Sequence, residues 1–390
     1  MSLSNPEAER IVRSGVAALQ RGDPRAAAAA FEQVAASGRA GAPVWLLLAH
    51  AHRATGDAAA EEAALDALLA IEPGVPRGLI MKGDRRAAAG DARAASSFYK
   101  KGLNAAAAAS EPLPADLQEK LVRVRAWLDI NEGAYREHLE REMAKRFPAA
   151  GRSRRFQQSL DILFGEKQAC FQRPTSYFFP ELPQIQFYER SLFPWVEALE
   201  AATTGIKEEL LALMRSRELF QPYLVAAPDR PRSDFHGLLD NPKWSSLYLW
   251  ENGRPVEENA ARCPVTFAAL EKVPLPRIGV RAPVVMFSWL QAGARIPPHN
   301  GAMNARLICH LPLIVPSGCG FRVGNEVRAW EPGKLLIFDD TIEHEAWNDS
   351  DEDRVVLIFD IWRPELDEAE RAAVAAMFEA VDSFPGTLKA

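Results

Sequence analysis

The sequence predicts two domains: an all-α repeat domain, then an all-β domain built as an antiparallel sandwich or barrel. The length of 390 residues exceeds one typical domain. The alanine-rich first part carries a Gly-Asp pair at a constant interval, and the second part carries short β-type runs separated by turn residues. These three observations place a helical repeat before a sheet-rich domain.

The first part, to about residue 145, is rich in Ala, Leu, Arg and Glu, which predicts helix throughout. The Gly-Asp pairs lie 34 residues apart (56 − 22 and 90 − 56), at Gly22, Gly56 and Gly90. Each is followed nine positions later by a large side chain: Phe31, Leu65 and Tyr99. Gly permits a turn between two helices, and Asp caps the second helix.

This pattern resembles the tetratricopeptide repeat, whose period is about 34 residues, with a plain helical bundle as the alternative. A stack of such repeats offers a groove for a peptide or protein partner. We expect residues 1–145 to form the TPR-like domain and residues 146–174 a charged helical linker. Residues 175–390 would form the second domain, with a closing helix near its C-terminal end.

Five β-type runs occupy the second domain, at residues 246–250, 284–290, 305–315, 334–339 and 354–362. Segments rich in Gly, Pro, Asp and Ser separate the later runs. Many short strands with turns between them are typical of antiparallel sandwiches and barrels rather than of parallel sheets.

Composition excludes several classes of protein. A net charge of -6 argues against a dedicated nucleic-acid surface, which is usually basic. The four cysteines are spread without a CxxC pair, which indicates a reducing compartment and no structural zinc site. The N-terminus lacks the pattern of a secretory signal, and no run of about 18 apolar residues predicts a transmembrane segment. We therefore expect a cytoplasmic protein.

Three histidines fall within the strand-rich half: His299, His310 and His344. His299 precedes Asn-Gly, a turn signal, and therefore marks a strand end. His344 follows the run 334–339 and precedes another strand-like segment. Two imidazoles that come together from separate strands suit an iron ion. The alternative is that each histidine is structural or exposed.

Strand alternation groups two arginines with these histidines. In the run from Arg306, His310 shares the face of Arg306, and in the last run Arg354 shares a face with Asp360. An arginine inside a barrel is costly unless an anion meets it. A dicarboxylate such as 2-oxoglutarate would supply that anion. A surface arginine after the acidic segment 349–353 is the alternative for Arg354.

The stretch from residue 299 to residue 366 carries HxG, RLxxHL, FDDxxEHxxWN and DxWxPEL in this order. It resembles the aspartyl/asparaginyl β-hydroxylase family of Fe(II)- and 2-oxoglutarate-dependent dioxygenases, over roughly residues 175–365. The resemblance implies a double-stranded β-helix, a jelly roll of the cupin type. It also implies roles for seven residues: iron binding by His299 and His344, 2-oxoglutarate binding by Arg354, Ser288 and His310, an active-site tryptophan at Trp244, and a substrate contact at Arg306.

Glycine stands at position 301, where many related oxygenases carry a third, carboxylate ligand. The resemblance implies that water completes the iron shell, since the family lacks that carboxylate. In the less favoured alternative an acidic residue near His344 becomes a ligand, the candidates being Asp339, Asp340, Glu343 and Glu345.

The implied function is hydroxylation with 2-oxoglutarate and O2, releasing succinate and CO2. The expected substrate is an Asp or Asn residue or a related amino-acyl group, carried by a peptide, a protein or a carrier that the repeats recruit. Ile308 stands where animal members carry an arginine, and Cys263 has no neighbouring cysteine, so disulfide-linked domains are not expected substrates. The alternatives are a lipid fatty-acyl hydroxylase of the same family and a non-enzymatic repeat scaffold with an inactive cupin domain.

Overall fold

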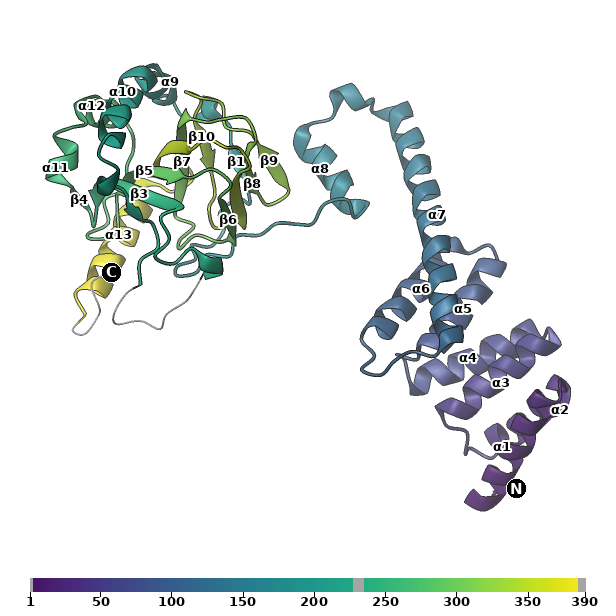
Figure 1. Ribbon diagram of the computed structural model, residues 1–390. Helices are drawn as coiled ribbons and strands as arrows, with labels where there is room; N and C mark the ends of the chain where they lie inside the picture. The colour runs from purple at the N-terminus through teal and green to yellow at the C-terminus, as the bar shows by residue number, and fades with distance from the viewer. Residues whose placement is uncertain (1–2, 227–234, 385–390) are drawn as a thin grey trace. The chain divides into compact units, whose positions relative to one another are not determined.

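The structure is a computed structural model that describes residues 3–226 and 235–384. The chain divides into two compact units, Met1–Phe164 and Gly165–Ala390 (Figure 1). The first unit is helical, and the second is built from antiparallel sheets with flanking helices. The predicted fold class, an all-α repeat followed by a sheet-rich domain, is confirmed.

The first unit is a succession of helical hairpins. Its helices are α1 (Asn5–Gln20), α2 (Pro24–Ala36), α3 (Ala42–Thr55), α4 (Ala58–Ile71), α5 (Pro76–Ala88), α6 (Ala92–Ala107), α7 (Ala115–Arg146) and α8 (Arg154–Leu163). Helix α1 packs on α2, α3 on α4, and α5 on α6 (Figure 1). The 34-residue period of the sequence therefore corresponds to one hairpin.

The turn inside each hairpin follows the predicted chemistry. Gly56 has φ of 78°, a left-handed conformation that favours glycine. The carboxylate of Asp57 then accepts a hydrogen bond from the backbone N of Ala60 at 3.0 Å and caps α4. The equivalent glycines and aspartates of the other two hairpins behave in the same way: Gly22 with Asp23, and Gly90 with Asp91.

A second periodic feature, not singled out from the sequence, joins the two helices of a hairpin. A Cβ on Gly15 would overlap the ring of Phe31, and a Cβ on Gly83 would overlap the ring of Tyr99. The missing side chain allows the helices to approach closely. The residue one repeat after Gly15 is Ala49, which is fully buried. A small residue facing a large one is thus part of the repeat.

Helix α7 ends the stack and continues beyond it. Its buried residues all lie in its first half, from Leu117 to Leu128, where they pack with α6. Helix α8 then returns along α7, so that the Arg136 guanidinium lies 5.0 Å from the ring centroid of Phe164. Within residues 3–226 and 235–384, no helix has both the length and the apolar character needed to cross a membrane.

The described part of the second unit contains two antiparallel sheets. The larger has the strand order β1-β10-β7-β12-β5-β3-β2, with β4 paired to β3, and the smaller has the order β6-β11-β8-β9. The strands are β1 (Phe187–Tyr188), β2 (Gln221–Pro222), β3 (Trp244–Glu251), β4 (Arg254–Pro255), β5 (Val285–Leu290), β6 (Arg295–His299), β7 (Arg306–Ile314), β8 (Cys319–Val323), β9 (Glu326–Arg328), β10 (Leu336–Phe338), β11 (His344–Asn348) and β12 (Arg354–Trp362).

From β5 to β12 the chain passes repeatedly between the sheets. Strands β5, β7, β10 and β12 belong to the larger sheet, and β6, β8, β9 and β11 to the smaller one. This alternation is the connectivity of a double-stranded β-helix. All five runs read from the sequence coincide with strands of the larger sheet.

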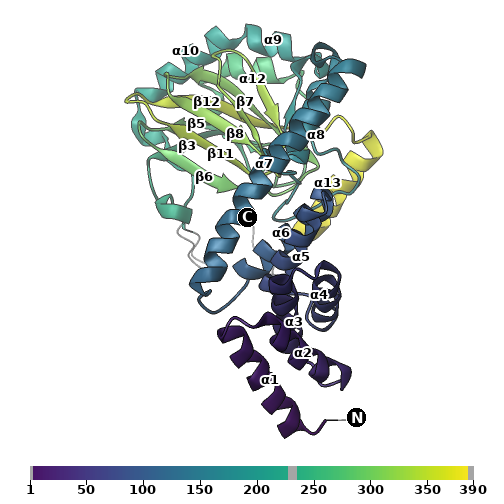
Figure 2. The same cartoon turned by 90° about the vertical axis from the view of Figure 1, so that its right-hand side faces the viewer.

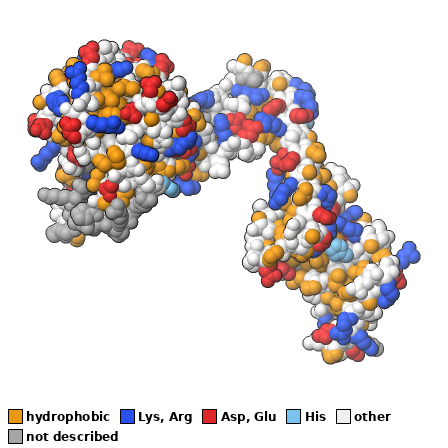
Figure 3. Space-filling model, viewed as in Figure 1, with side chains coloured by type: hydrophobic (Ala, Val, Ile, Leu, Met, Phe, Trp, Pro, Cys, Tyr) orange, Lys and Arg blue, Asp and Glu red, His pale blue; other side chains and the backbone are white. Residues whose placement is uncertain are grey.

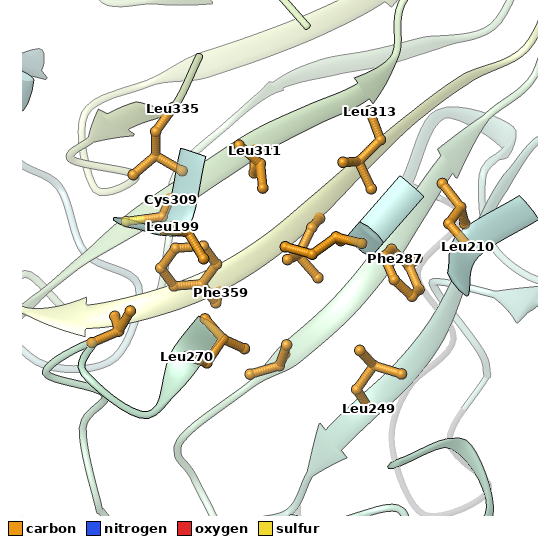
Figure 4. Packing of buried hydrophobic residues seen from close by; sticks show 14 of the residues in the cluster. Leu199, Leu210, Leu249, Leu270, Phe287, Cys309, Leu311, Leu313, Leu335 and Phe359 are labelled. Atoms are coloured by element: carbon orange, nitrogen blue, oxygen red, sulfur yellow. The ribbon is translucent and has the colours of Figure 1, made fainter. Parts of the chain in front are cut away.

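Helices cover the outer face of the larger sheet (Figure 2). They are α9 (Val196–Ala201), α10 (Thr203–Met214) and α12 (Pro264–Leu270), while the short α11 (Glu257–Ala260) contacts β3. Leu199 of α9 and Leu210 of α10 meet Phe287, Leu311 and Phe359 of the sheet (Figure 4). This core fixes one face of strands β5, β7 and β12, and their other face is directed between the sheets. The closing helix, α13 (Glu368–Asp382), packs separately through Val374 and Phe378.

Candidate active site

The side chains between the two sheets follow the alternation predicted for β7 and β12. Leu307, Cys309 and Leu311 of β7 lie in the outer core under the helices. Arg306, Ile308 and His310 therefore face a cavity of about 400 Å³ between the sheets. On β12, Arg354, Ile358 and Asp360 line the same cavity.

His299, the last residue of β6, and His344, the first residue of β11, lie next to each other. They are directly opposite in the antiparallel pairing of β6 with β11, and their ring centroids are 4.1 Å apart. His299 Nδ1 lies 2.8 Å from the carbonyl oxygen of Pro297, and His344 Nδ1 lies 3.2 Å from that of Ile342. If each Nδ1 donates its proton to that carbonyl, each Nε2 keeps a lone pair for a metal.

Burial favours the neutral form of both rings. It lowers the pKa of His344 to about 3, an effect that the neighbouring His299 increases. Burial likewise lowers the pKa of His299 below its usual value. Two neutral imidazoles held side by side are suitable ligands for a divalent transition metal.

Arg354 is fully buried beside this pair. Its guanidinium carbon lies 4.5 Å from the ring centroid of Trp330, and Nη1 lies 3.4 Å from the carbonyl oxygen of Ser288. Its Nε has no hydrogen-bond partner, and no carboxylate in the described part of the chain pairs with it. Burial lowers the pKa of Arg354 to about 10, which leaves it charged near neutral pH. Such a buried cation calls for an anion from outside the protein.

Three further predicted residues surround Arg354. Ser288 is buried on β5, and the indole Nε1 of Trp244 on β3 donates to its Oγ at 3.3 Å. His310 packs between Phe321 and Phe338, with ring centroids at 5.1 and 4.8 Å, and its Nδ1 has no hydrogen-bond partner among the described residues. Burial lowers the pKa of His310 well below its usual value, with Arg354 and His344 adding to the effect, so the ring is neutral.

Arg306 lies at another part of the cavity wall, between two buried carboxylates. Its Nη1 and Nη2 are each 3.5 Å from a carboxylate oxygen, of Asp360 and Asp340 respectively. Burial raises the pKa of Asp340 to about 6 against the opposing effect of Arg306. Oδ1 of Asp340 has no hydrogen-bond partner within residues 3–226 and 235–384. This cluster carries two carboxylates and one guanidinium, so any anion approaching Arg306 also meets negative charge.

The acidic residues near His344 differ in their surroundings. Asp339 accepts hydrogen bonds from Thr341, Gln172 and Arg363, while Glu343 and Glu345 pair with Arg322. Of the four alternative ligands, only Asp340 lines the cavity. Within residues 3–226 and 235–384, no three or more His, Cys, Asp and Glu side chains are grouped so that they could hold a metal.

A buried polar network supports the segments that carry the two histidines. Arg363 is fully buried and binds Asp339 at 2.8 Å, Tyr188 and the carbonyl oxygen of Pro183. Gln172 joins Asp339 to Asn304 through bonds of 2.6 and 2.9 Å. Asp339 thereby fixes the segment before His344, and Asn304 the segment after His299.

The sequence did not single out several of these side chains. Trp330 lies in the segment after β9, and only the closure of the two sheets places it against Arg354. Tyr223 stacks on Trp244, with ring centroids 4.2 Å apart, across a separation of 21 residues (244 − 223). Asp360 was visible only as a residue that shares the face of Arg354.

Two known structures are similar to about a third of the chain. The Sgt2 TPR domain from Aspergillus fumigatus gives a TM-score of 0.29 at 19% identity, over 34% of this chain and 83% of that one. The translocator chaperone SycD from Yersinia enterocolitica gives a TM-score of 0.30 at 16% identity, over 33% of this chain and 86% of that one.

Several curated proteins are similar to the chain. Human aspartyl/asparaginyl beta-hydroxylase is 35% identical over 203 residues, which is 49% of this chain but only 26% of the human protein. The ornithine lipid ester-linked acyl 2-hydroxylase of Rhizobium tropici is 37% identical over 183 residues, 45% of this chain and 60% of that protein.

A longer match extends to the mouse aspartate beta-hydroxylase domain-containing protein 1. It is 33% identical over 270 residues, covering 64% of this chain and 70% of the mouse protein. Residues 200–364 also match the family model described as aspartyl/asparaginyl beta-hydroxylase. These residues contain the histidine pair and both cavity arginines, and the chain belongs to the aspartyl/asparaginyl beta-hydroxylase family.

Proposed function

We propose that the strand-rich unit is an Fe(II)- and 2-oxoglutarate-dependent hydroxylase. The observation that carries this proposal is the buried guanidinium of Arg354, which no carboxylate of the described residues pairs with, in the same cavity as the facing pair His299 and His344. A cation of this kind suits a carboxylate of the cosubstrate, and the imidazole pair suits a metal. Neither feature has an evident purely structural role.

The donor set fits iron. His299 and His344 would hold the metal through Nε2, with their Nδ1 atoms directed at backbone carbonyls. Gly301 provides no side chain that could bind the metal, so water would take the place of a third protein ligand. When bound, iron, 2-oxoglutarate and O2 would supply the oxidising chemistry for insertion of oxygen into a C–H bond, with succinate and CO2 as coproducts.

The protein's residues would position and shield the reactants. Arg354 and Ser288 would bind the carboxylate remote from the metal, with Trp244 orienting the Ser288 hydroxyl. The neutral ring of His310 would add one hydrogen bond through its free Nδ1. Phe321 at this end of the cavity, and Trp330 stacked behind it against Arg354, would exclude water from the site.

For the substrate, we propose an Asp or Asn residue or a related amino-acyl group. A peptide, a protein or a carrier would present it, with recruitment by the helical repeats. Arg306 would then contact the substrate, at a point where Asp340 and Asp360 already offset its charge.

A specific observation favours a second candidate, a fatty-acyl chain. Ile308, Met286, Val284 and Ile358 give the cavity an apolar wall next to Arg306. An acyl chain would bury apolar surface there, whereas a carboxylate would meet two acidic groups. The Rhizobium tropici relative, whose name describes an acyl 2-hydroxylase, supports this candidate.

The test is iron-dependent succinate production from 2-oxoglutarate in air, with an Asp/Asn peptide panel or an acyl-lipid panel supplied. We expect the wild type and the exposed control Arg254→Met to release succinate, and His344→Ala and Arg354→Met to release none. A mass increase of one oxygen in one panel would identify the substrate class. Folded wild type that releases no iron-dependent succinate with either panel would contradict the proposal and support a repeat scaffold.

A further inference from the structure

The turn between α7 and α8 concentrates positive charge. Between Glu142 and Asp161 the sequence contains no acidic residue, although the whole chain carries a net charge of -6. The same interval contains five basic residues: Lys145, Arg146, Arg152, Arg154 and Arg155. Four of them are exposed, and Arg152 is half-buried. The α7–α8 turn is therefore a basic surface on an acidic protein.

Large apolar side chains are exposed in the same place. Phe147 is 51% exposed, Phe156 39% and Leu163 58%. Phe156 and Leu163 are seven residues apart on α8 and so share one helix face, next to the buried Leu160. Basic and hydrophobic side chains lie close together on this hairpin (Figure 3).

A hollow at the α7–α8 turn lies between the basic residues and the exposed apolar side chains. Met143, Phe147, Gly151, Ser153 and Phe156 line it. Its walls are mostly apolar, and the basic residues 145, 146, 152, 154 and 155 lie along the same segment of chain. Exposed apolar groups bordered by cationic side chains mark an interaction surface.

We propose that residues 145–163 form a docking surface for an anionic lipid bilayer. The charged ends of the arginine and lysine side chains would bind lipid phosphates. Phe147, Phe156 and Leu163 would insert at the boundary between the lipid head groups and the acyl chains. A cluster of four to eight basic residues on an amphipathic helix is the pattern that anionic membranes attract. Ile162 and Leu163 of α8 are 42% and 58% exposed and add aliphatic surface, which a nucleic-acid site built on stacking rings and cations does not need.

This surface is independent of the proposed activity, because it contains none of the cavity residues. A hydroxylase of peptides and a hydroxylase of lipids would both bind vesicles through it. For a lipid substrate, the surface would also raise the local concentration of that substrate around the chain.

The experiment is sedimentation of the full chain with vesicles of phosphatidylglycerol and phosphatidylcholine, compared with vesicles of phosphatidylcholine alone. We expect binding to the anionic vesicles that weakens as salt is raised. The variant Arg152→Gln/Arg154→Gln/Arg155→Gln should lower the partition coefficient by about 100-fold. Phe147→Ser/Phe156→Ser should lower it by about 10-fold or more.

The matched control is Arg25→Gln/Arg93→Gln/Lys101→Gln, which removes the same charge from exposed positions on α2 and α6. It should bind as the wild type does, and all variants should keep the wild-type melting temperature. Wild type that does not sediment with anionic vesicles, or variants that bind as well as the control, would overturn the proposal. Binding to RNA without binding to vesicles would assign the surface to nucleic acid. Exchange protection of residues 145–163 without vesicle binding would assign it to a protein contact.

Discussion

The carboxylate of Asp340 occupies the space beside Gly301, and a Cβ placed on Gly301 would overlap both of its oxygens. The backbone reinforces this arrangement, because the N–H of Gly301 donates to the carbonyl oxygen of Asp340 at 2.7 Å. A third carboxylate ligand at position 301 is therefore incompatible with the present position of Asp340. Close packing against the Asp340 carboxylate therefore explains the glycine at position 301.

Gly301→Ala should destabilise the strand-rich unit by about 1–3 kcal/mol, because the added methyl group must displace the Asp340 carboxylate. The variant should also bind Mn(II) more weakly, since residue 301 follows His299 closely. Urea unfolding and Mn(II) titration would measure the two effects. If Gly301→Ala kept both the stability and the Mn(II) affinity of the wild type, the Asp340 carboxylate would have moved aside without cost.

Arg354 and Arg363 are both fully buried, and they should respond oppositely to substitution. Arg354 has no carboxylate partner among the described residues, so Arg354→Met should raise the melting temperature of the ligand-free protein by about 2 °C or more. Arg363 is paired with Asp339 at 2.8 Å, so Arg363→Met should destabilise the protein by about 3–5 kcal/mol. Thermal unfolding in chelator without 2-oxoglutarate would compare them. A large loss of stability in Arg354→Met would mean that this arginine has a structural partner.

Metal binding should depend on both members of the histidine pair. His299→Ala and His344→Ala should each abolish Mn(II) binding, because each removes one of the two imidazoles that face each other at 4.1 Å. His138→Ala, at an exposed position of α7, is the control. The free Mn(II) signal in electron paramagnetic resonance would measure binding. Tight binding retained in either single variant would place the metal elsewhere.

Two helical glycines of the repeat unit provide a matched pair. A Cβ on Gly83 would overlap the Tyr99 ring, so Gly83→Ala should destabilise the repeats by about 1–3 kcal/mol. In the described part of the chain nothing lies within 4 Å of a Cβ on Gly133, so Gly133→Ala should stabilise α7 by up to about 1 kcal/mol. Chemical unfolding followed by circular dichroism would give both values. Equal effects of the two substitutions would contradict the close packing of α5 on α6.

The 34-residue repeat and the two-residue alternation along strands allowed much of the fold to be predicted from the sequence. The 34-residue interval set the hairpins, and Asp57 caps its helix as the residue type implies. Alternation along β7 and β12 placed Arg306, His310 and Arg354 on cavity-facing positions, because the opposite residues of each strand are all apolar. Local rules of this kind need no knowledge of tertiary contacts.

Contacts between distant segments could not be read in the same way. Gln172 binds Asp339 across 167 residues, and Arg363 meets Tyr188 across 175. The strands and helices near these residues do not determine which acidic group each polar side chain will meet. For the same reason the sequence left four acidic residues open as ligands, and only the packing shows that Asp340 alone of the four faces the cavity.

The most direct test of the hydroxylase assignment is anaerobic calorimetry of 2-oxoglutarate binding, with Mn(II) in place of iron. We expect wild type to bind 2-oxoglutarate only when Mn(II) is present, and His344→Ala not to bind it. Arg354→Met should weaken binding by about 100-fold, because the carboxylate loses its charged partner. Metal-independent binding, or full affinity in Arg354→Met, would contradict the assignment of this cavity to the cosubstrate.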